Sequence, residues 1–277
     1  MKRVLLALIA LSGAMTCLAQ DSTAKDKADT IRVGGMIIIK DHKNDDDTTK
    51  RNRNITISNR NKRKSSNLTT NWWIVDIGFA NLKDETNYAQ ALSSGFVGAG
   101  VDKDQLDLKT GKSVNVNVWF FMQKLNVVKH VVNLKYGLGL ELNNYRFDNE
   151  TVRFSKNPTK ITLDDNLKDI KKNKLAADYI TVPFMVNFNL TPKQKKGFGF
   201  SAGVSAGMLY SARQKIKDNG NKNKLHDDFD LEKWKLSYIG ELNLGPVRLY
   251  GSYAMNNMWE KVLDQTPYNV GIRLSHW

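Results

Sequence analysis

The stretch SVNVNVWFF, residues 113–121, decides the fold of this chain. Its three valines alternate with two asparagines, and alternation with a period of two indicates a β-strand with one apolar and one polar face. In a soluble protein the apolar face normally points into the core, whereas in an outer-membrane barrel the same face contacts lipid. The interpretation of the whole sequence depends on which of the two holds here.

Seven further runs repeat this alternation. The eight runs are residues 72–80, 113–122, 131–145, 177–190, 197–210, 234–244, 247–255 and 268–274. No segment has convincing helical periodicity. Long polar connections follow the first, third, fifth and seventh runs, at about residues 82–111, 147–174, 213–232 and 257–266. The other connections are short. Alternating long loops and short turns are typical of outer-membrane barrels, and an even strand number places both termini on the periplasmic side.

Aromatic residues gather near both ends of the expected strands. The expected inner rim has Trp73, Phe120, Phe188, Phe198 and Trp277, and the outer rim has Tyr210, Tyr253 and Tyr268, with Trp234 close by. Two such belts mark the interfaces of a bilayer with water. We therefore expect the valines of residues 113–121 to face lipid and the asparagines to face the lumen. The alternative is a soluble lipocalin-like barrel that turns the valines inward around an apolar ligand.

The N-terminal segment predicts export. Lys2 and Arg3 precede an apolar run and then small residues, which is the pattern of a secretory signal peptide over residues 1–19. An alternative is a lipoprotein acylated at Cys17. Because Cys17 is the only cysteine, the mature chain is expected to have no disulfide, thiol nucleophile or thiolate metal site.

A charged arm, residues 20–69, separates this leader from the expected barrel, residues 70–277. A short β segment is expected at residues 31–40, with a turn at Gly34-Gly35. The formal charge of +14 falls by two when the leader is removed. Part of the remaining charge forms a basic arm of Lys50, Arg51, Arg53, Arg60, Lys62, Arg63 and Lys64. In an exported protein we expect this arm to meet lipid head groups, lipopolysaccharide or an acidic envelope protein, and not nucleic acid.

The polar face of the runs carries charges that must meet inside a narrow lumen. They are Lys135, Glu141, Lys235, Glu241, Arg248 and Arg273. Buried charges need partners, so we expect a carboxylate–guanidinium network that fills the barrel. Eight strands enclose only enough room for side chains. This disfavours a general porin and leaves a polar conduit as the alternative.

Catalytic signatures are weak. GVSAG, residues 203–207, matches the G-x-S-x-G pattern of a hydrolase nucleophile elbow, but an elbow needs a strand-to-helix turn and Ser205 lies in mid-strand. The four histidines, His42, His130, His226 and His276, lack metal-ligand spacing. His226 with Asp227 and Asp228 is the one visible loop group for catalysis, and a solvated loop is the preferred interpretation. We expect no enzyme, cofactor or metal site.

Several stretches resemble a known family. NWWIVDIGF (71–79), YGLGLELNNYRFD (136–148), YITVPFMVNFN (179–189), GVSAG (203–207) and PYNVGIRLSHW (267–277) are similar to the PorT-like outer-membrane β-barrel proteins of Gram-negative bacteria. The resemblance implies an outer-membrane barrel, and some members are accessories of protein secretion. One departure is that Trp277 is out of phase with the apolar residues of the last run, which a terminal bulge would correct.

We therefore predict an all-β protein, an eight-stranded antiparallel transmembrane β-barrel with a flexible periplasmic N-terminal arm. Its expected location is the outer membrane of a Gram-negative bacterium. The expected role is structural or interactional, in envelope assembly, as a secretion accessory or as a surface scaffold. A barrel that binds or transports a small apolar ligand is the alternative function.

Overall fold

The structure, a computed structural model, describes residues 29–33, 36–40, 66–164, 170–192, 197–218 and 221–275. The chain divides into two units, Met1–Ser65 and Ser66–Trp277. In the first unit, β1 (Asp29–Val33) pairs antiparallel with β2 (Met36–Lys40), which is the hairpin expected around residues 31–40. The leader, Cys17, the Gly34-Gly35 turn, the basic arm and Trp277 lie outside the described residues.

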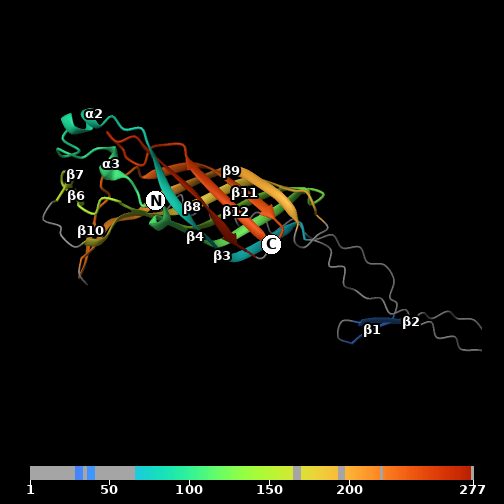
Figure 1. Cartoon of the computed structure of the whole chain (residues 1–277). Coiled ribbons are helices and arrows are strands. Elements are labelled where there is room, and N and C mark those ends of the chain that lie inside the picture. Colours follow the sequence, from blue (N-terminus) through green and yellow to red (C-terminus); the bar gives the residue numbers. More distant parts are fainter. Residues whose placement is uncertain are drawn as a thin grey trace, which may run out of the picture. The chain divides into compact units, whose positions relative to one another are not determined.

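The second unit is a closed antiparallel barrel of eight strands (Figure 1). They are β3 (Leu68–Asp84), β4 (Val114–Val128), β5 (Val132–Arg146), β8 (Ile170–Asn189), β9 (Phe198–Asp218), β11 (Trp234–Leu244), β12 (Val247–Ala254) and β13 (Gln265–Leu274). Each strand pairs with the next one in this order, and the last strand, β13, pairs back onto β3. The predicted fold class is confirmed, with every predicted run inside or overlapping one of these strands.

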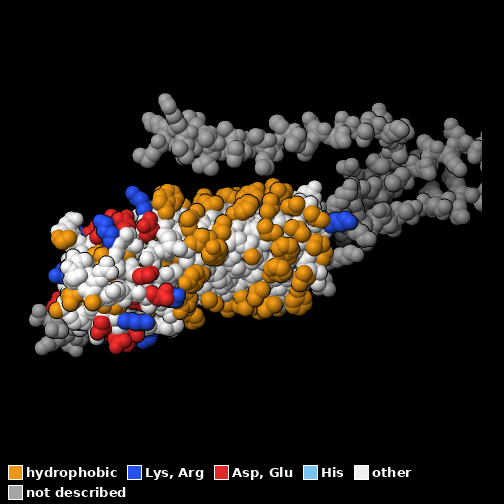
Figure 2. All heavy atoms as spheres, turned by 90° about the horizontal axis from the view of Figure 1, so that it is seen from above, with side chains coloured by type: hydrophobic (Ala, Val, Ile, Leu, Met, Phe, Trp, Pro, Cys, Tyr) orange, Lys and Arg blue, Asp and Glu red, His pale blue; other side chains and the backbone are white. Residues whose placement is uncertain are grey.

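The apolar faces of the strands point outward. Phe79 is 55% exposed and Val270 is 60% exposed, whereas Asn115 and Asn117 in β4 are 0% and 6% exposed. On the face that Figure 2 shows, the outward apolar side chains gather as a band over the barrel wall, while the charged side chains lie beyond it. Because a lipid bilayer is the environment in which such a band is stable, the valines of residues 113–121 face lipid, as expected, and the asparagines face the lumen.

Short turns join the strands at one end of the barrel. The turn between β11 and β12 is formed by Gly245 and Pro246, and the φ of Gly245 is +77°. This left-handed conformation favours glycine because a side chain would clash with the backbone. The short connection expected between the sixth and seventh runs is confirmed.

The long loops at the other end contain more secondary structure than the sequence suggested. Loop 85–113 contains α2 (Tyr88–Ser93), α3 (Lys103–Leu106) and the 3₁₀ turn η1 (Thr110–Lys112). Each helix is capped by a side chain, of Asn87 or Asp102, and is too short to show a 3.6-residue period. These helices were not expected because no segment has convincing helical periodicity. Within the described ranges, no helix is long and apolar enough to cross a bilayer.

Two hairpins extend the other long loops. β6 (Val152–Ser155) pairs with β7 (Lys160–Leu163), and β10 (Asn221–His226) pairs with residues 213–218 at the C-terminal end of β9. The expected loop 213–232 is therefore largely strand. Polar and charged residues alternate there with Ala212, Gln214 and Ile216, so the usual apolar signal of a strand is weak.

All four long loops contribute to one hydrophobic core, which we call the cap. Its buried loop residues are Phe96, Val97, Val101, Leu106, Phe147, Val152, Phe154, Ile161, Phe229, Leu231, Met258, Trp259 and Leu263. They pack on Tyr145, Leu175 and Tyr179 of the barrel wall. In Figure 1 the helices and hairpins of these loops gather at one end of the barrel. The cap therefore has a core of its own at the long-loop end of the barrel.

Phe154 is central to the cap. Its ring stacks on Trp259 with an interplanar angle of 4° and a centroid distance of 5.9 Å. The rings of Phe147 and Phe229 lie 5.7 Å and 5.4 Å away. Aromatic pairs at these distances contribute beyond the area they bury. One side chain of β6 thus connects segments from three different loops.

Replacement of Phe154 should open the cap and leave the barrel closed. We expect Phe154→Ala to destabilise the cap by about 3–5 kcal/mol, because a large buried side chain leaves a cavity. Limited proteolysis of the reconstituted protein should then cut the loops faster, while the heat-dependent gel shift of the barrel persists. Phe184→Ala is the matched control, since Phe184 is 51% exposed on the lipid face. Equal cleavage of both variants would contradict the role assigned to Phe154.

Candidate functional site

The lumen contains six charged side chains that form ion pairs, which we call the lumen cluster: Asp76, Lys135, Glu141, Lys235, Glu241 and Arg273. Their side chains are 10% exposed or less. They come from β3, β5, β11 and β13. Each lies on the polar face of its strand and therefore points into the lumen. Three carboxylates meet three cations, so the formal charges of the cluster cancel.

Arg273 is the most connected member. Its Nε lies 2.6 Å from Asp76 Oδ1 and its second terminal nitrogen lies 2.7 Å from Asp76 Oδ2, so the pair is bidentate. The other terminal nitrogen donates to Glu241. Its guanidinium carbon also lies 5.6 Å from the ring centroid of Trp119, within cation–π range. Planar, two-pronged geometry is the specific property of arginine at buried carboxylates.

Asp76 has further donors. Trp119 Nε1 donates to Asp76 Oδ2 over 2.7 Å, and Asn117 Nδ2 donates to the same oxygen over 3.2 Å. Trp119 fits in the lumen because Gly139 lies opposite on β5. A Cβ at Gly139 would be 2.7 Å from Trp119 Cε3, which is closer than packed atoms come. The strand pattern therefore supplies both the buried carboxylate and the donors that satisfy it.

Glu141 pairs with Lys235 in the second part of the cluster. Asn269 Nδ2 and Asn143 Nδ2 donate to Glu141 Oε1 over 3.2 Å and 3.1 Å. The Lys235 ammonium also lies 5.5 Å from the ring centroid of Tyr179, on the wall beneath the cap. A buried carboxylate needs hydrogen bonds at the lone pairs that its ion pair does not use. The neutral amides of Asn269 and Asn143 supply them.

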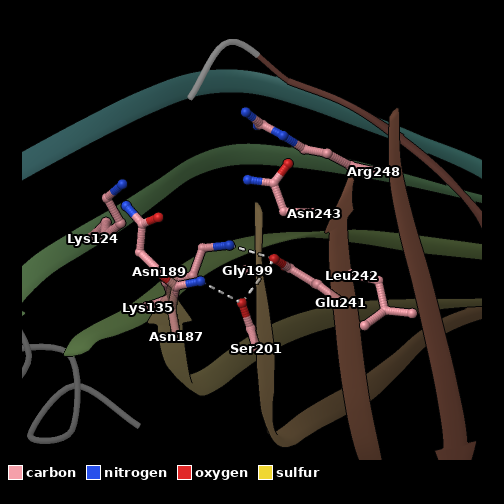
Figure 3. A pocket seen from close by; sticks show the side chains of 10 residues that line it. All are labelled: Lys124, Lys135, Asn187, Asn189, Gly199, Ser201, Glu241, Leu242, Asn243 and Arg248. Carbon is pink, nitrogen blue, oxygen red and sulfur yellow. Dashed lines mark hydrogen bonds and ion pairs between the residues drawn. The ribbon is translucent and has the colours of Figure 1, made fainter. Parts of the chain in front are cut away.

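The third part of the cluster surrounds Glu241 and lies toward the short-turn end of the barrel. Figure 3 shows its side chains from close by. Lys135 donates to Glu241, and Ser201 Oγ donates to the same carboxylate over 3.2 Å. Arg248, the remaining charge of the sequence prediction, lies nearer the mouth and donates to Ser275 Oγ. Lys124 shares this mouth, and the cavity that these residues line measures about 40 Å³. A second cavity, beside Trp119 and Arg273, measures about 30 Å³.

Two contributors were missed from the sequence, Asp76 and Trp119, and the asparagines of residues 113–121 were placed in the lumen without a role in the charge network. Asp76 stands between Val75 and Ile77, on the opposite face of the strand, so the alternation there contains a signal for a lumen position. Its importance could not be seen because its partner, Arg273, is 197 residues away. Trp119 was on the polar face of the opening stretch, but a tryptophan there resembles a rim residue.

The loop group around His226 borders a surface depression of about 430 Å³. His226, Asp227 and Asp228 line it with Lys233 and Glu260. Within the described ranges, no group of three or more histidine, cysteine or carboxylate side chains is placed to hold a metal ion.

Ser205 lies in the interior of β9, which continues on both sides of it. It is 6% exposed and its register partners are Pro183 on β8 and Ser237 on β11. The strand-to-helix turn of a nucleophile elbow is absent at this described position. The small residues around it leave space for neighbouring strands, since a Cβ at Gly203 would be 2.6 Å from Met185 Cα.

Separating Asp76 from Arg273 should destabilise the barrel. We expect Asp76→Asn and Arg273→Gln each to lower the free energy of unfolding by about 3–5 kcal/mol, since each removes the bidentate partner of a buried charge. The double variant should lose less than the sum of the two losses. Urea unfolding in phospholipid vesicles, followed by the heat-dependent gel shift, measures all three.

The matched control for this cycle is the exposed pair of Arg153 and Asp164, 3.2 Å apart. Its coupling should be at most about 1 kcal/mol, because solvent screens it. A coupling of Asp76 and Arg273 no larger than that of the control pair would contradict the assignment.

Comparison with known proteins places this geometry in a family. The family model described as an outer membrane protein beta-barrel domain matches residues 77–258. No curated protein matches the chain. The matched residues run from β3 into the connection between β12 and β13, so they cover most of the barrel and its cap. The closed ring, the outward apolar band and this match agree, and the chain belongs to the outer membrane protein beta-barrel domain family.

Proposed function

We propose that this protein is a non-conducting, non-catalytic outer-membrane barrel with a structural or interaction role in the cell envelope. The observation that carries the proposal is the lumen cluster. Three carboxylates and three cations occupy the interior, and the cavities around Glu241 and beside Trp119 measure about 40 Å³ and 30 Å³. Such volumes hold only a few waters. Solute passage would require these buried ion pairs to separate.

The cap supports the same proposal. Side chains from four loops bury one another at the long-loop end of the barrel. A transporter needs a route past its loops, and here the route is filled by an aromatic core around Phe154. The outer surface of the cap and the outer wall of the barrel are then the regions available to partners.

The alternative function, a barrel for a small apolar ligand, is less well supported. An apolar ligand requires an apolar cavity, whereas charged and amide side chains line the lumen, with a small apolar group of Ile74, Trp119, Met122 and Met185. Catalysis by Ser205 is equally weakly supported because its backbone is extended. We propose that neither activity is present.

The finer assignments are also proposals. The resemblance to PorT-like proteins favours an accessory role in secretion or envelope assembly in a Gram-negative bacterium. The leader pattern favours export, and an even strand number favours a periplasmic N-terminal arm. We propose that the basic arm contacts anionic lipid or an acidic partner there.

Conductance is the test of the closed lumen. The full-length protein in planar bilayers should give no stable conductance steps above background, because ion pairs occupy the lumen. A general porin inserted in the same membrane is the positive control. Large, stable steps from the intact protein would overturn the proposal.

Ligand and catalytic activity are tested on the same preparation. A hydrophobic dye should show no saturable binding beyond that of the lipid or detergent alone, and a fluorophosphonate probe should leave Ser205 unlabelled. Saturable dye binding displaced by a lipid would support the ligand-binding alternative. Labelling that disappears in Ser205→Ala would support an enzyme.

A further inference from the structure

Six lysines lie in two rows across three neighbouring strands beyond the apolar band. In one row Lys172 on β8 is the register partner of Lys217 on β9, which pairs with Lys222 on β10. In the second row Lys174 pairs with Lys215, which pairs with Lys224. We call these six residues the lysine face.

The six side chains point the same way, outward. Register partners in an antiparallel pair share a face, and the residues between the lysines, Asn173, Gln214 and Ile216, are buried on the opposite side. Strands lie about 4.8 Å apart and alternate residues about 6.7 Å apart. The six ammonium groups therefore belong to one compact patch of a single sheet.

Carboxylates do not neutralise this patch within the described part of the chain. No ion pair joins any of the six lysines to an acid there, while the nearby Arg213 is paired with Asp178. Lys174 donates to the neutral Asn144. The patch lies beyond the membrane-spanning part of the strands. Burial, and after it the charges of Lys172 and Lys215, lowers the pKa of Lys174 to about 8.

Like charges directly opposite one another destabilise a sheet. Two rows of facing lysines are therefore unfavourable unless another effect offsets their repulsion. Lysines protect exposed sheet edges from pairing with another chain, which accounts for Lys222 and Lys224 on the edge strand β10. That reason does not extend to Lys174, Lys215 and Lys217, which have register partners on both sides. A bound polyanion would remove the repulsion in all three strands.

The position of the patch identifies the kind of polyanion. The outward faces of the same strands have Ile180, Val182 and Phe184 on β8, and Val204, Met208 and Tyr210 on β9, all exposed to lipid. Lys215 follows Tyr210 by five residues. At about 3.3 Å per residue and a tilt of about 40°, this places it roughly 13 Å above the aromatic rim. The head-group layer of an ordinary bilayer is only about 5–8 Å thick on each side.

We propose that the lysine face binds the anionic saccharide head group of an outer-leaflet glycolipid, through phosphates attached to its sugars. Such a head group extends beyond the level of phospholipid phosphates and remains anchored beside the apolar band. The inference rests on the barrel being inserted with its long loops outward, and it is independent of whether the lumen conducts.

The test uses full-length protein in phosphatidylcholine nanodiscs containing a small fraction of phosphorylated lipopolysaccharide. Retained glycolipid is quantified by mass spectrometry after repeated washing. We expect about tenfold enrichment over the same lipopolysaccharide after chemical dephosphorylation, and over phosphatidylglycerol at equal charge. Enrichment should fall as NaCl is raised, because salt screens exposed charges.

The decisive variant replaces the four lysines of the inner two strands: K172Q, K174Q, K215Q and K217Q. The matched control removes the same charge from exposed cap positions: K103Q, K112Q, K156Q and K261Q. We expect the enrichment to be lost in the first variant and kept in the second. The heat-dependent gel shift checks that both are folded. If the first variant does not fold, K222Q with K224Q should lower the enrichment several-fold.

Three results would overturn the proposal. They are equal losses in both variants, equal enrichment of dephosphorylated lipopolysaccharide, and binding of soluble polyphosphate without retention of the glycolipid. Conductance of the same protein in planar bilayers tests the closed lumen separately. A conducting barrel can still bind glycolipid, so failure of one proposal is distinguishable from failure of the other.

Discussion

The bidentate pair of Arg273 and Asp76 is the interaction on which the closed barrel depends. The two residues are register partners at the seam where the last strand, β13, meets the first, β3. The same guanidinium also reaches Glu241 on β11 and so joins three strands. Hydrogen bonds of the strands close the ring, but they recur along every pair. A buried ion pair is satisfied in one register only, because a shift of β13 by one residue would turn Arg273 toward lipid and leave Asp76 buried without its partner.

The interior has two parts with different physical chemistry. Around the lumen cluster, charges and amides satisfy one another, and glycines such as Gly139 let large side chains enter a narrow space. At the long-loop end, the wall residues Tyr145 and Tyr179 lie under an aromatic core. Lys235 connects the parts, since it pairs with Glu141 and lies over the ring of Tyr179. Together they leave little internal space for a substrate.

Function is therefore best sought on the outer surfaces of this protein. The wall offers an apolar band to lipid, the cap offers a folded surface, and the lysine face lies between them on β8, β9 and β10. The basic arm adds a second cationic region, which precedes the barrel in the sequence. Membership of an outer-membrane barrel family is consistent with contacts made from the outside of the barrel.

Alternation by itself determined the eight barrel strands, their facing and five of the six charges of the lumen cluster. A period of two fixes which residues of a strand share a face. The alternation of long and short connections then indicated that the apolar face meets lipid and the polar face meets the lumen. The tertiary structure alone decided which charges meet. Asp76 and Arg273 are joined by ring closure, which no local pattern encodes. The cap, too, was invisible beforehand. Its helices span one or two turns, and its apolar residues are scattered over four loops that become one core only when the barrel brings them together.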